Sequence, residues 1–176
     1  LTLTTGTTLS QFVMLAALPI LTRLYTPSEF GLFAAFTVLS TIIGTLACLG
    51  YEPAIVLPKR DGTALSLWVL CVLLGAAVTI TFTIIFATWP REIAEIIGNP
   101  GLTDLLALVP VTVFIWAITV ATTQWCTRNR EFSTVSISIV LNRLATVTSQ
   151  AIFGVIPMVI GSIGLLVGFM LGALAG

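Results

Sequence analysis

Long apolar runs alternate along the chain with short stretches rich in charge, proline and glycine. A helix that crosses a bilayer needs about 20 mostly apolar residues. The pattern predicts six such helices, over residues 5–21, 29–49, 63–88, 102–125, 133–155 and 157–176. Helices are expected because backbone polar groups find no water partners in the hydrocarbon core. The expected fold class is therefore all-α, a polytopic six-helix membrane bundle.

The composition agrees with a lipid environment. Of the 176 residues, 57% are hydrophobic and 8% are charged, whereas soluble domains carry about 25% charged residues. A soluble domain of this size leaves much of its surface in water and could not hide so much apolar surface. Seven basic residues balance seven acidic ones, so the basic excess typical of nucleic-acid binding is missing. We therefore expect membrane lipids, and no nucleic acid, as partners.

The basic residues predict the orientation, because cytoplasmic loops are enriched in Lys and Arg. Four of them lie in the loops after the second and fourth segments: Lys59, Arg60, Arg128 and Arg130. Two lie in the loops after the first and third segments: Arg23 and Arg91. The bias predicts a cytoplasmic N-terminus. The chain begins without Met and ends inside an apolar run, which we interpret as the mark of a fragment.

The fifth segment is amphipathic although it is expected to span the membrane. At about 100° per residue, its polar side chains fall within about 140° of one face. They are Ser138, Asn142, Arg143, Thr146, Ser149 and Gln150. The opposite face is apolar. The polar face is therefore expected to meet protein or water.

Arg143 lies near the middle of this segment, where a charge costs about 2.5 kcal/mol or more. One interpretation is a cationic site in a translocation pathway, suited to a phosphate-bearing solute by its planar guanidinium. The other is a structural pair with a carboxylate such as Glu52, or a side chain that reaches the interface. Gln150 also allows two roles, a hydrogen bond to a solute or a bridge between two helices.

Glycine and proline residues predict how the helices pack and bend. Glycines recur every four residues in the last segment, at Gly164, Gly168, Gly172 and Gly176. Such a groove favours close contact with another helix, from this bundle, from a missing part of the chain or from another protomer. Pro19 and Pro110 are expected to kink their helices. The meeting of the last two segments at Ile156 and Pro157 predicts a tight helical hairpin.

Signatures of catalysis and of metal binding are missing from the sequence. There is no His and no GxxxxGK[ST] phosphate loop, and the three cysteines form no CxxC pair. The seven acidic residues fall in loops or at the expected helix ends, so no buried acid suited to ion coupling is evident. We expect no enzyme activity, no cofactor and no metal.

Two loop motifs carry a family resemblance. They are PILTRLYTPSEFGLFAAF, from Pro19 to Phe36, and LGYEPAIVLPKRDGTAL, from Leu49 to Leu65. Together they resemble the N-terminal region of bacterial polysaccharide biosynthesis membrane proteins. These are the oligosaccharide flippases of O-antigen, capsule and exopolysaccharide pathways, in the multidrug/oligosaccharidyl-lipid/polysaccharide exporter superfamily. The later stretch TRNREFSTVSISIVLNRLATVTSQAIFG resembles the family's fourth loop and fifth helix.

The resemblance implies a fold and a function. It implies twelve or more helices in two six-helix lobes around a central cavity, of which this chain supplies the N-terminal lobe. It implies that an undecaprenyl-pyrophosphate-linked oligosaccharide moves by alternating access across the bacterial inner membrane. By matching position, Arg143 would bind this substrate, with Asn142 and Gln150 as supporting contacts. The implied partner is the second lobe or another protomer.

Two other functions stay open at this point. A multidrug or small-solute exporter of the same superfamily is one, although such proteins usually need an acid buried in the membrane. A non-transporting membrane subunit that scaffolds a glycan synthesis complex is the other, favoured by the short length and by the glycine groove.

Overall fold

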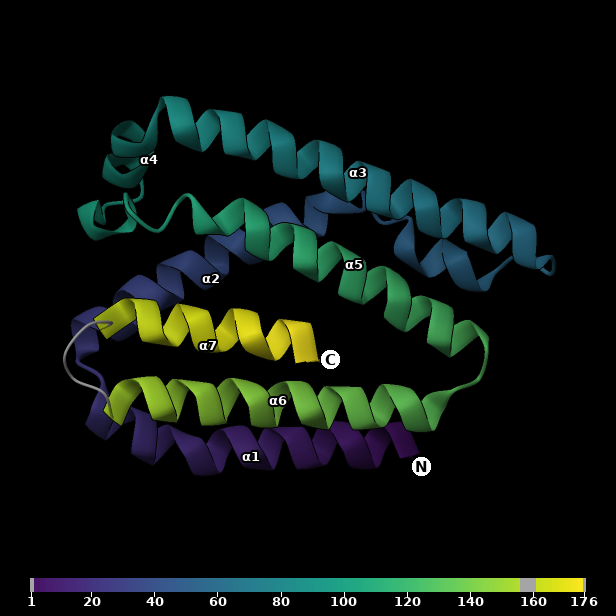
Figure 1. The fold of residues 1–176 in the computed structure, drawn as a ribbon, viewed down its shortest axis with the longest axis horizontal. Coiled ribbons are helices and arrows are strands. Elements are labelled where there is room, and N and C mark those ends of the chain that lie inside the picture. The colour runs from purple at the N-terminus through teal and green to yellow at the C-terminus, as the bar shows by residue number, and fades with distance from the viewer. Residues whose placement is uncertain (1, 156–160, 176) are drawn as a thin grey trace. The chain divides into compact units, whose positions relative to one another are not determined.

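A computed structural model describes residues 2–155 and 161–175 of the chain. All regular structure in these ranges is helical, which confirms the all-α expectation for them (Figure 1). The elements are α1 (Thr2–Leu24), α2 (Pro27–Ala47), the 3-10 helix η1 (Glu52–Val56), α3 (Asp61–Thr88), α4 (Pro90–Ile96), the 3-10 helix η2 (Pro100–Leu102), α5 (Leu108–Arg128), α6 (Phe132–Val155) and α7 (Gly161–Ala175).

Four described helical stretches are long and apolar enough to cross a membrane. They are Pro27–Ala47, Asp61–Thr88, Leu108–Arg128 and Ser133–Ile152. The apolar part of α1, Ser10–Leu24, is shorter, and α7 has 15 residues. The count of six spans therefore stays a prediction. The hairpin predicted at Ile156 and Pro157 lies outside the described residues.

The fourth predicted segment differs most from the structure. Its helix, α5, begins at Leu108 instead of residue 102, and the preceding chain forms α4, η2 and turns. Gly98 ends α4 with φ 77°, and the amides of Gly98 and Asn99 bond back to Glu95 and Ala94. This is a Schellman cap, which glycine favours because it adopts positive φ without strain. The cap separates α4 from the apolar run that follows.

The later start of α5 also changes the role of Pro110. Pro110 lies in the first turn of α5, where the missing N–H would have had no partner within the helix. The kink predicted at Pro110 therefore has no cause in this structure. Pro19 does lie inside α1, where it removes one backbone hydrogen bond.

The chain divides into two compact units. The first consists of Leu1–Phe33 and Arg130–Gly176, and thus holds α1, the start of α2, α6 and α7. The second is Ala34–Asn129, with the rest of α2, both 3-10 helices, α3, α4 and α5. The arrangement of all the helices as a single lobe stays a prediction.

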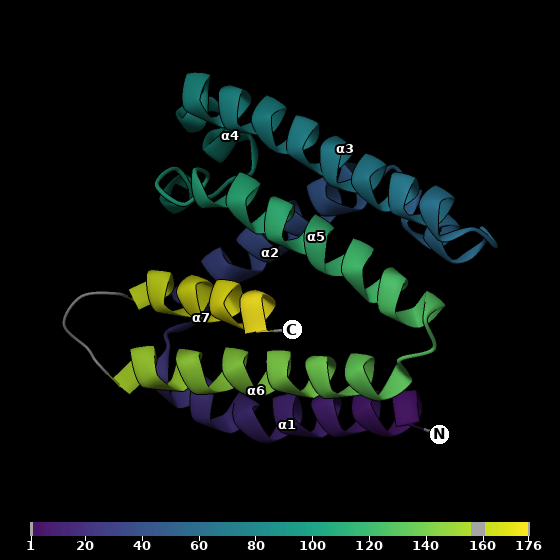
Figure 2. The same cartoon turned by 45° about the vertical axis from the view of Figure 1, so that its right-hand side comes forward.

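In the first unit, α6 packs against both α1 and α7 (Figures 1 and 2). A Cβ added at Gly168 would lie 2.9 Å from the backbone nitrogen of Gln150, and one added at Gly172 would collide with Thr146. Two of the four predicted groove positions therefore face a neighbouring helix of the same chain. For these two positions, the partner helix predicted from the glycine groove is therefore one of this bundle.

In the second unit, α3 lies beside α5, and η1 packs against both (Figure 2). Gly75 makes this approach possible, because a Cβ there would lie 2.9 Å from that of Ala117. Gly44 of α2 contacts the ring of Trp116 on α5 in a similar way, because a Cβ at Gly44 would collide with that ring. Small residues thus set the helix spacing, as is typical of membrane bundles.

Apolar side chains line one side of three helices and remain exposed. On α3 they are Leu65, Val69, Leu73, Ile80 and Ile84, on α2 Val38, Ile42 and Leu46, and on α6 Ile137, Leu141, Leu144 and Ile152. Soluble proteins rarely expose contiguous apolar stripes of this extent. Lipid is the environment in which these stripes are stable.

Candidate functional site

Arg143 lies on α6, half-buried, on the side of the helix away from the exposed apolar stripe. It shares this side with Gln150, because seven residues bring a helix back to within about 20° of the same direction. Its own unit contains two carboxylates, Glu29 and Glu131, and neither forms an ion pair with it. Over the described residues, the guanidinium also has no hydrogen-bond partner. Glu52 belongs to the second unit, so the alternative pair with Glu52 stays untested.

Gln150 is a structural link in the first unit. Its side chain is 5% exposed, and its Nε2 donates to the backbone carbonyl of Leu165 on α7 at 3.1 Å. Its own backbone carbonyl accepts a hydrogen bond from the hydroxyl of Tyr25 at 2.7 Å. Gln150 therefore bridges α6 and α7, which is one of the two roles predicted for it from the sequence. Contact with a substrate stays a prediction.

Asn142 lies next to Arg143 and is half-buried. Its backbone carbonyl accepts a hydrogen bond from Thr146 Oγ1 at 2.7 Å, close to Gly172 of α7. Its side-chain amide has no hydrogen-bond partner among the described residues. The polar face of α6 is therefore divided. Thr146 and Gln150 are buried against α7, whereas the side-chain polar groups of Asn142 and Arg143 have no hydrogen-bond partner in the described ranges and are in this sense uncommitted.

Tyr25, in the turn between α1 and α2, also stabilises the first unit. It is 6% exposed and packs with Ala17, Leu21 and Leu165. Burial raises the pKa of its phenol, and the negative charge of Glu29 raises it further. The neutral phenol is thus the form that the folded protein favours, and this form donates the bond to Gln150.

We expect Tyr25→Phe to lower the free energy of unfolding by about 1 kcal/mol, the net worth of one buried hydrogen bond. The raised folded-state pKa means that the wild type keeps its full stability below the ordinary tyrosine pKa and loses some as the pH rises above it. Unfolding in detergent, followed by circular dichroism from pH 8 to about 11, measures both effects. An equally steep alkaline loss in Tyr25→Phe would exclude Tyr25 as its source.

A charged cluster lies at the C-terminal end of α5. From the sequence, its basic residues predicted only the orientation of the chain in the membrane. Arg128 is 12% exposed, and its Nη1 lies 2.7 Å from Oδ1 of Asp61. Its Nη2 donates to the carbonyl of Pro58 at 3.1 Å, and the guanidinium lies 5.8 Å from the ring centre of Trp125. Elsewhere in this unit, Oε2 of Glu52 is buried without a hydrogen-bond partner among the described residues. Arg128 thus ties the chain before α3 to α5.

We expect the two members of this ion pair to differ in importance. Asp61→Asn should cost less than about 1 kcal/mol of unfolding free energy, because the Asp61 side chain is 86% exposed. Arg128→Ala should cost about 2 kcal/mol, since the Pro58 carbonyl and Trp125 also lose their partner. Unfolding curves of the two variants in the same detergent test the order. Equal losses would mean that the ion pair alone matters.

Metal binding receives no support from the described part of the chain. No group of three or more His, Cys, Asp or Glu side chains is placed there to hold an ion. Cys48, Cys71 and Cys126 are free thiols, and the first two are buried.

The lipid-facing stripes, the four membrane-length helices and the uncommitted polar groups on α6 define a polytopic helical membrane protein. The family model described as polysaccharide biosynthesis protein matches residues 20–174. The chain therefore belongs to the polysaccharide biosynthesis protein family, and the resemblance noted in its loop motifs is confirmed. No curated protein and no solved structure matches the chain.

Proposed function

We propose that this chain is one lobe of a flippase that moves undecaprenyl-pyrophosphate-linked oligosaccharide across the bacterial inner membrane by alternating access. Membership of the polysaccharide biosynthesis family supports the pathway, which would be that of O-antigen, capsule or exopolysaccharide. The membrane-length helices support a role within the bilayer. A second six-helix lobe, or another protomer, would form the opposite wall of the cavity.

Arg143 is the observation that carries this proposal. It is a cation in a membrane-length helix, without a carboxylate partner in its own unit and without a hydrogen bond from the described residues. Charged residues at such a position face the bundle interior or a water-filled cavity, and those without a partner in the protein suit the second location. A guanidinium can donate two parallel hydrogen bonds to phosphate oxygens, which suits the pyrophosphate of the lipid carrier. Asn142 adds an uncommitted amide beside it.

The exposed apolar stripe of α6 also supports this orientation. Ile137, Leu141 and Leu144 face outward, so lipid covers that side of the helix. The polar groups of Arg143 lie on the other side, where a cavity would be. With the N-terminus in the cytoplasm, as the basic residues predict, the substrate would reach this cavity from the cytoplasmic leaflet.

Translocation in proteoliposomes tests the proposed function. The protein, joined to its second lobe if its gene encodes one, is reconstituted with a lipid-linked oligosaccharide that carries a fluorescent sugar. A membrane-impermeant reagent then destroys the label on the outer leaflet. We expect the destroyed fraction to rise from about one half towards all of the label. A fraction unchanged from protein-free liposomes would contradict a flippase and favour a scaffold.

The same vesicles distinguish a drug or small-solute exporter. Such a protein would accumulate fluorescent cations under an ion gradient and leave the oligosaccharide lipid in place. None of the acids of the described chain lies inside the four membrane-length stretches beyond the first turn of a helix, which weakens this alternative, whereas the buried Oε2 of Glu52 in η1 favours it.

A further inference from the structure

The segment between α2 and α3 has one buried and one exposed side. Ile55, in η1, is fully buried, and Arg128 holds the carbonyl of Pro58 at 3.1 Å. The ion pair of Arg128 with Asp61 fixes the point where α3 begins. The segment between α2 and α3 is therefore held against α5, and its other side faces outward.

The outward face combines apolar and basic side chains. Leu57 is 80% exposed, Tyr51 48% and Val56 40%. Lys59 and Arg60 follow directly and are exposed as well. We name these five residues the 51–60 surface. An aliphatic side chain as exposed as Leu57 is unfavourable in water, because its burial elsewhere would release about 2 kcal/mol.

The neighbouring helices place this surface at the membrane boundary. α2 ends at Ala47 and α3 begins at Asp61, and both are of membrane length and hydropathy. The segment that joins them must lie where acyl chains give way to headgroups and water. Tyrosine, aliphatic and basic side chains together are the composition of elements that lie in this zone.

We propose that the 51–60 surface docks on anionic phospholipids, with Val56 and Leu57 among the upper acyl chains and Lys59 and Arg60 at the lipid phosphates. Charge complementarity selects the lipid, because two adjacent cations stand exposed beside an apolar tip. Arg128 acts as a positioning residue, since its bonds to Pro58 and Asp61 hold the segment in this orientation. The proposal is independent of the transported substrate.

A fluorescent probe at position 57 tests the insertion. The three cysteines are replaced (Cys48→Ala, Cys71→Ala, Cys126→Ala), and NBD is attached through Leu57→Cys in the chain reconstituted in phosphatidylcholine vesicles with one quarter phosphatidylglycerol. Asp104→Cys, at an exposed polar position of another connecting segment, is the control. We expect lipids spin-labelled near the headgroup to quench the probe at 57 strongly and iodide to quench it weakly. Iodide quenching equal to that at position 104 would overturn the insertion.

The same probe tests the choice of lipid. Trace amounts of spin-labelled phosphatidylglycerol are compared with equal amounts of spin-labelled phosphatidylcholine. One basic residue at an anionic surface is worth about a fivefold enrichment, so the anionic lipid should quench clearly more. The double variant Lys59→Gln with Arg60→Gln should remove this difference, whereas the control Arg130→Gln should keep it. Equal quenching by both lipids in the unaltered chain would overturn the proposal.

Two further outcomes of this experiment would also decide the matter. If the double variant keeps the preference for phosphatidylglycerol, the cations of the 51–60 surface do not select the lipid. If protection of the probe rises with the amount of protein per vesicle, a second copy of the chain covers the surface instead of lipid. Circular dichroism of each variant in the vesicles verifies that the helices are formed.

Discussion

Arg143→Ala is expected to lower transport of the lipid-linked oligosaccharide by about 10-fold to 100-fold while the protein still inserts into the membrane. The factor follows from the loss of hydrogen bonds to a charged group, which are worth about 1.5–3 kcal/mol. Insertion should survive, because removal of a charge from a membrane helix lowers the cost of placing that helix in lipid. Surface polysaccharide of a strain that carries only this variant, together with the amount of protein in its membranes, measures the effect.

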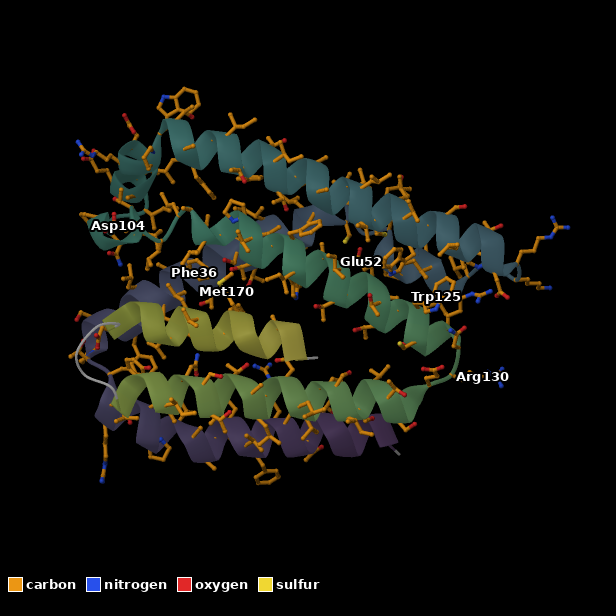
Figure 3. The ribbon with its side chains drawn as sticks, in the orientation of Figure 1. Phe36, Glu52, Asp104, Trp125, Arg130 and Met170 are labelled. Carbon is orange, nitrogen blue, oxygen red and sulfur yellow. The ribbon has the colours of Figure 1, made fainter. Side chains whose placement is uncertain are left out.

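Two variants separate the role of Arg143 from that of charge in general. Arg143→Lys keeps the charge but loses the planar donor pair, so we expect an intermediate transport rate. Arg130→Ala removes a cation from an exposed position before α6, where the side chain extends away from that helix (Figure 3), and should leave transport unchanged. Normal polysaccharide output from Arg143→Ala would remove Arg143 from the mechanism. A loss of protein from the membrane would instead assign Arg143 a structural role.

The helices were predictable because lipid imposes a simple rule on sequence. An apolar run of membrane length must be helical, and charges with proline or glycine mark its ends. α2, α3 and α6 accordingly end within about three residues of the predicted bounds. The rule fails for residues 102–107, where the predicted membrane helix is replaced by the last residue of η2 and a series of turns. Leu102, Leu105 and Leu106 are buried there by tertiary packing, and composition alone does not distinguish this from a membrane helix.

The candidate site was only partly predictable. The helical period placed Arg143 and Gln150 on one face of α6, and the structure keeps them there. The bond of Gln150 to Leu165 depends on which helix packs opposite, and a periodicity contains no such information. The pair of Arg128 with Asp61 joins residues 67 positions apart, calculated as 128 minus 61. Contacts of this kind arise only when helices meet, so the sequence indicated the charges but not their partners.

The contact between α6 and α7 leads to the second large effect. Gly172→Ala should destabilise the protein by about 1–3 kcal/mol, the usual cost of overpacking a close contact. The added methyl group would collide with Oγ1 of Thr146 and lie 2.9 Å from the backbone carbonyl of Asn142. Backbone cannot rotate away as a side chain can, so α7 would have to move from α6. Thermal unfolding in detergent, followed by circular dichroism, measures the loss.

Gly31→Ala is the matched control for this substitution. Gly31 also lies in a helix of the first unit, but a Cβ there has nothing within 4 Å, so the variant should be as stable as the wild type or slightly more so. Equal melting temperatures of Gly172→Ala and Gly31→Ala would show that α6 and α7 do not touch at Gly172.

A second substitution shows which atom near Gly172 causes the loss of stability in Gly172→Ala. Thr146→Ala removes Oγ1 but leaves the carbonyl of Asn142, so it should relieve the Gly172→Ala defect only in part. The remainder measures the backbone contact, since a double-mutant cycle isolates the coupling between the two positions. Asn142 precedes Arg143 directly, so a displaced α7 would also disturb the uncommitted polar pair. Gly172→Ala should therefore slow transport even at temperatures where the protein remains folded.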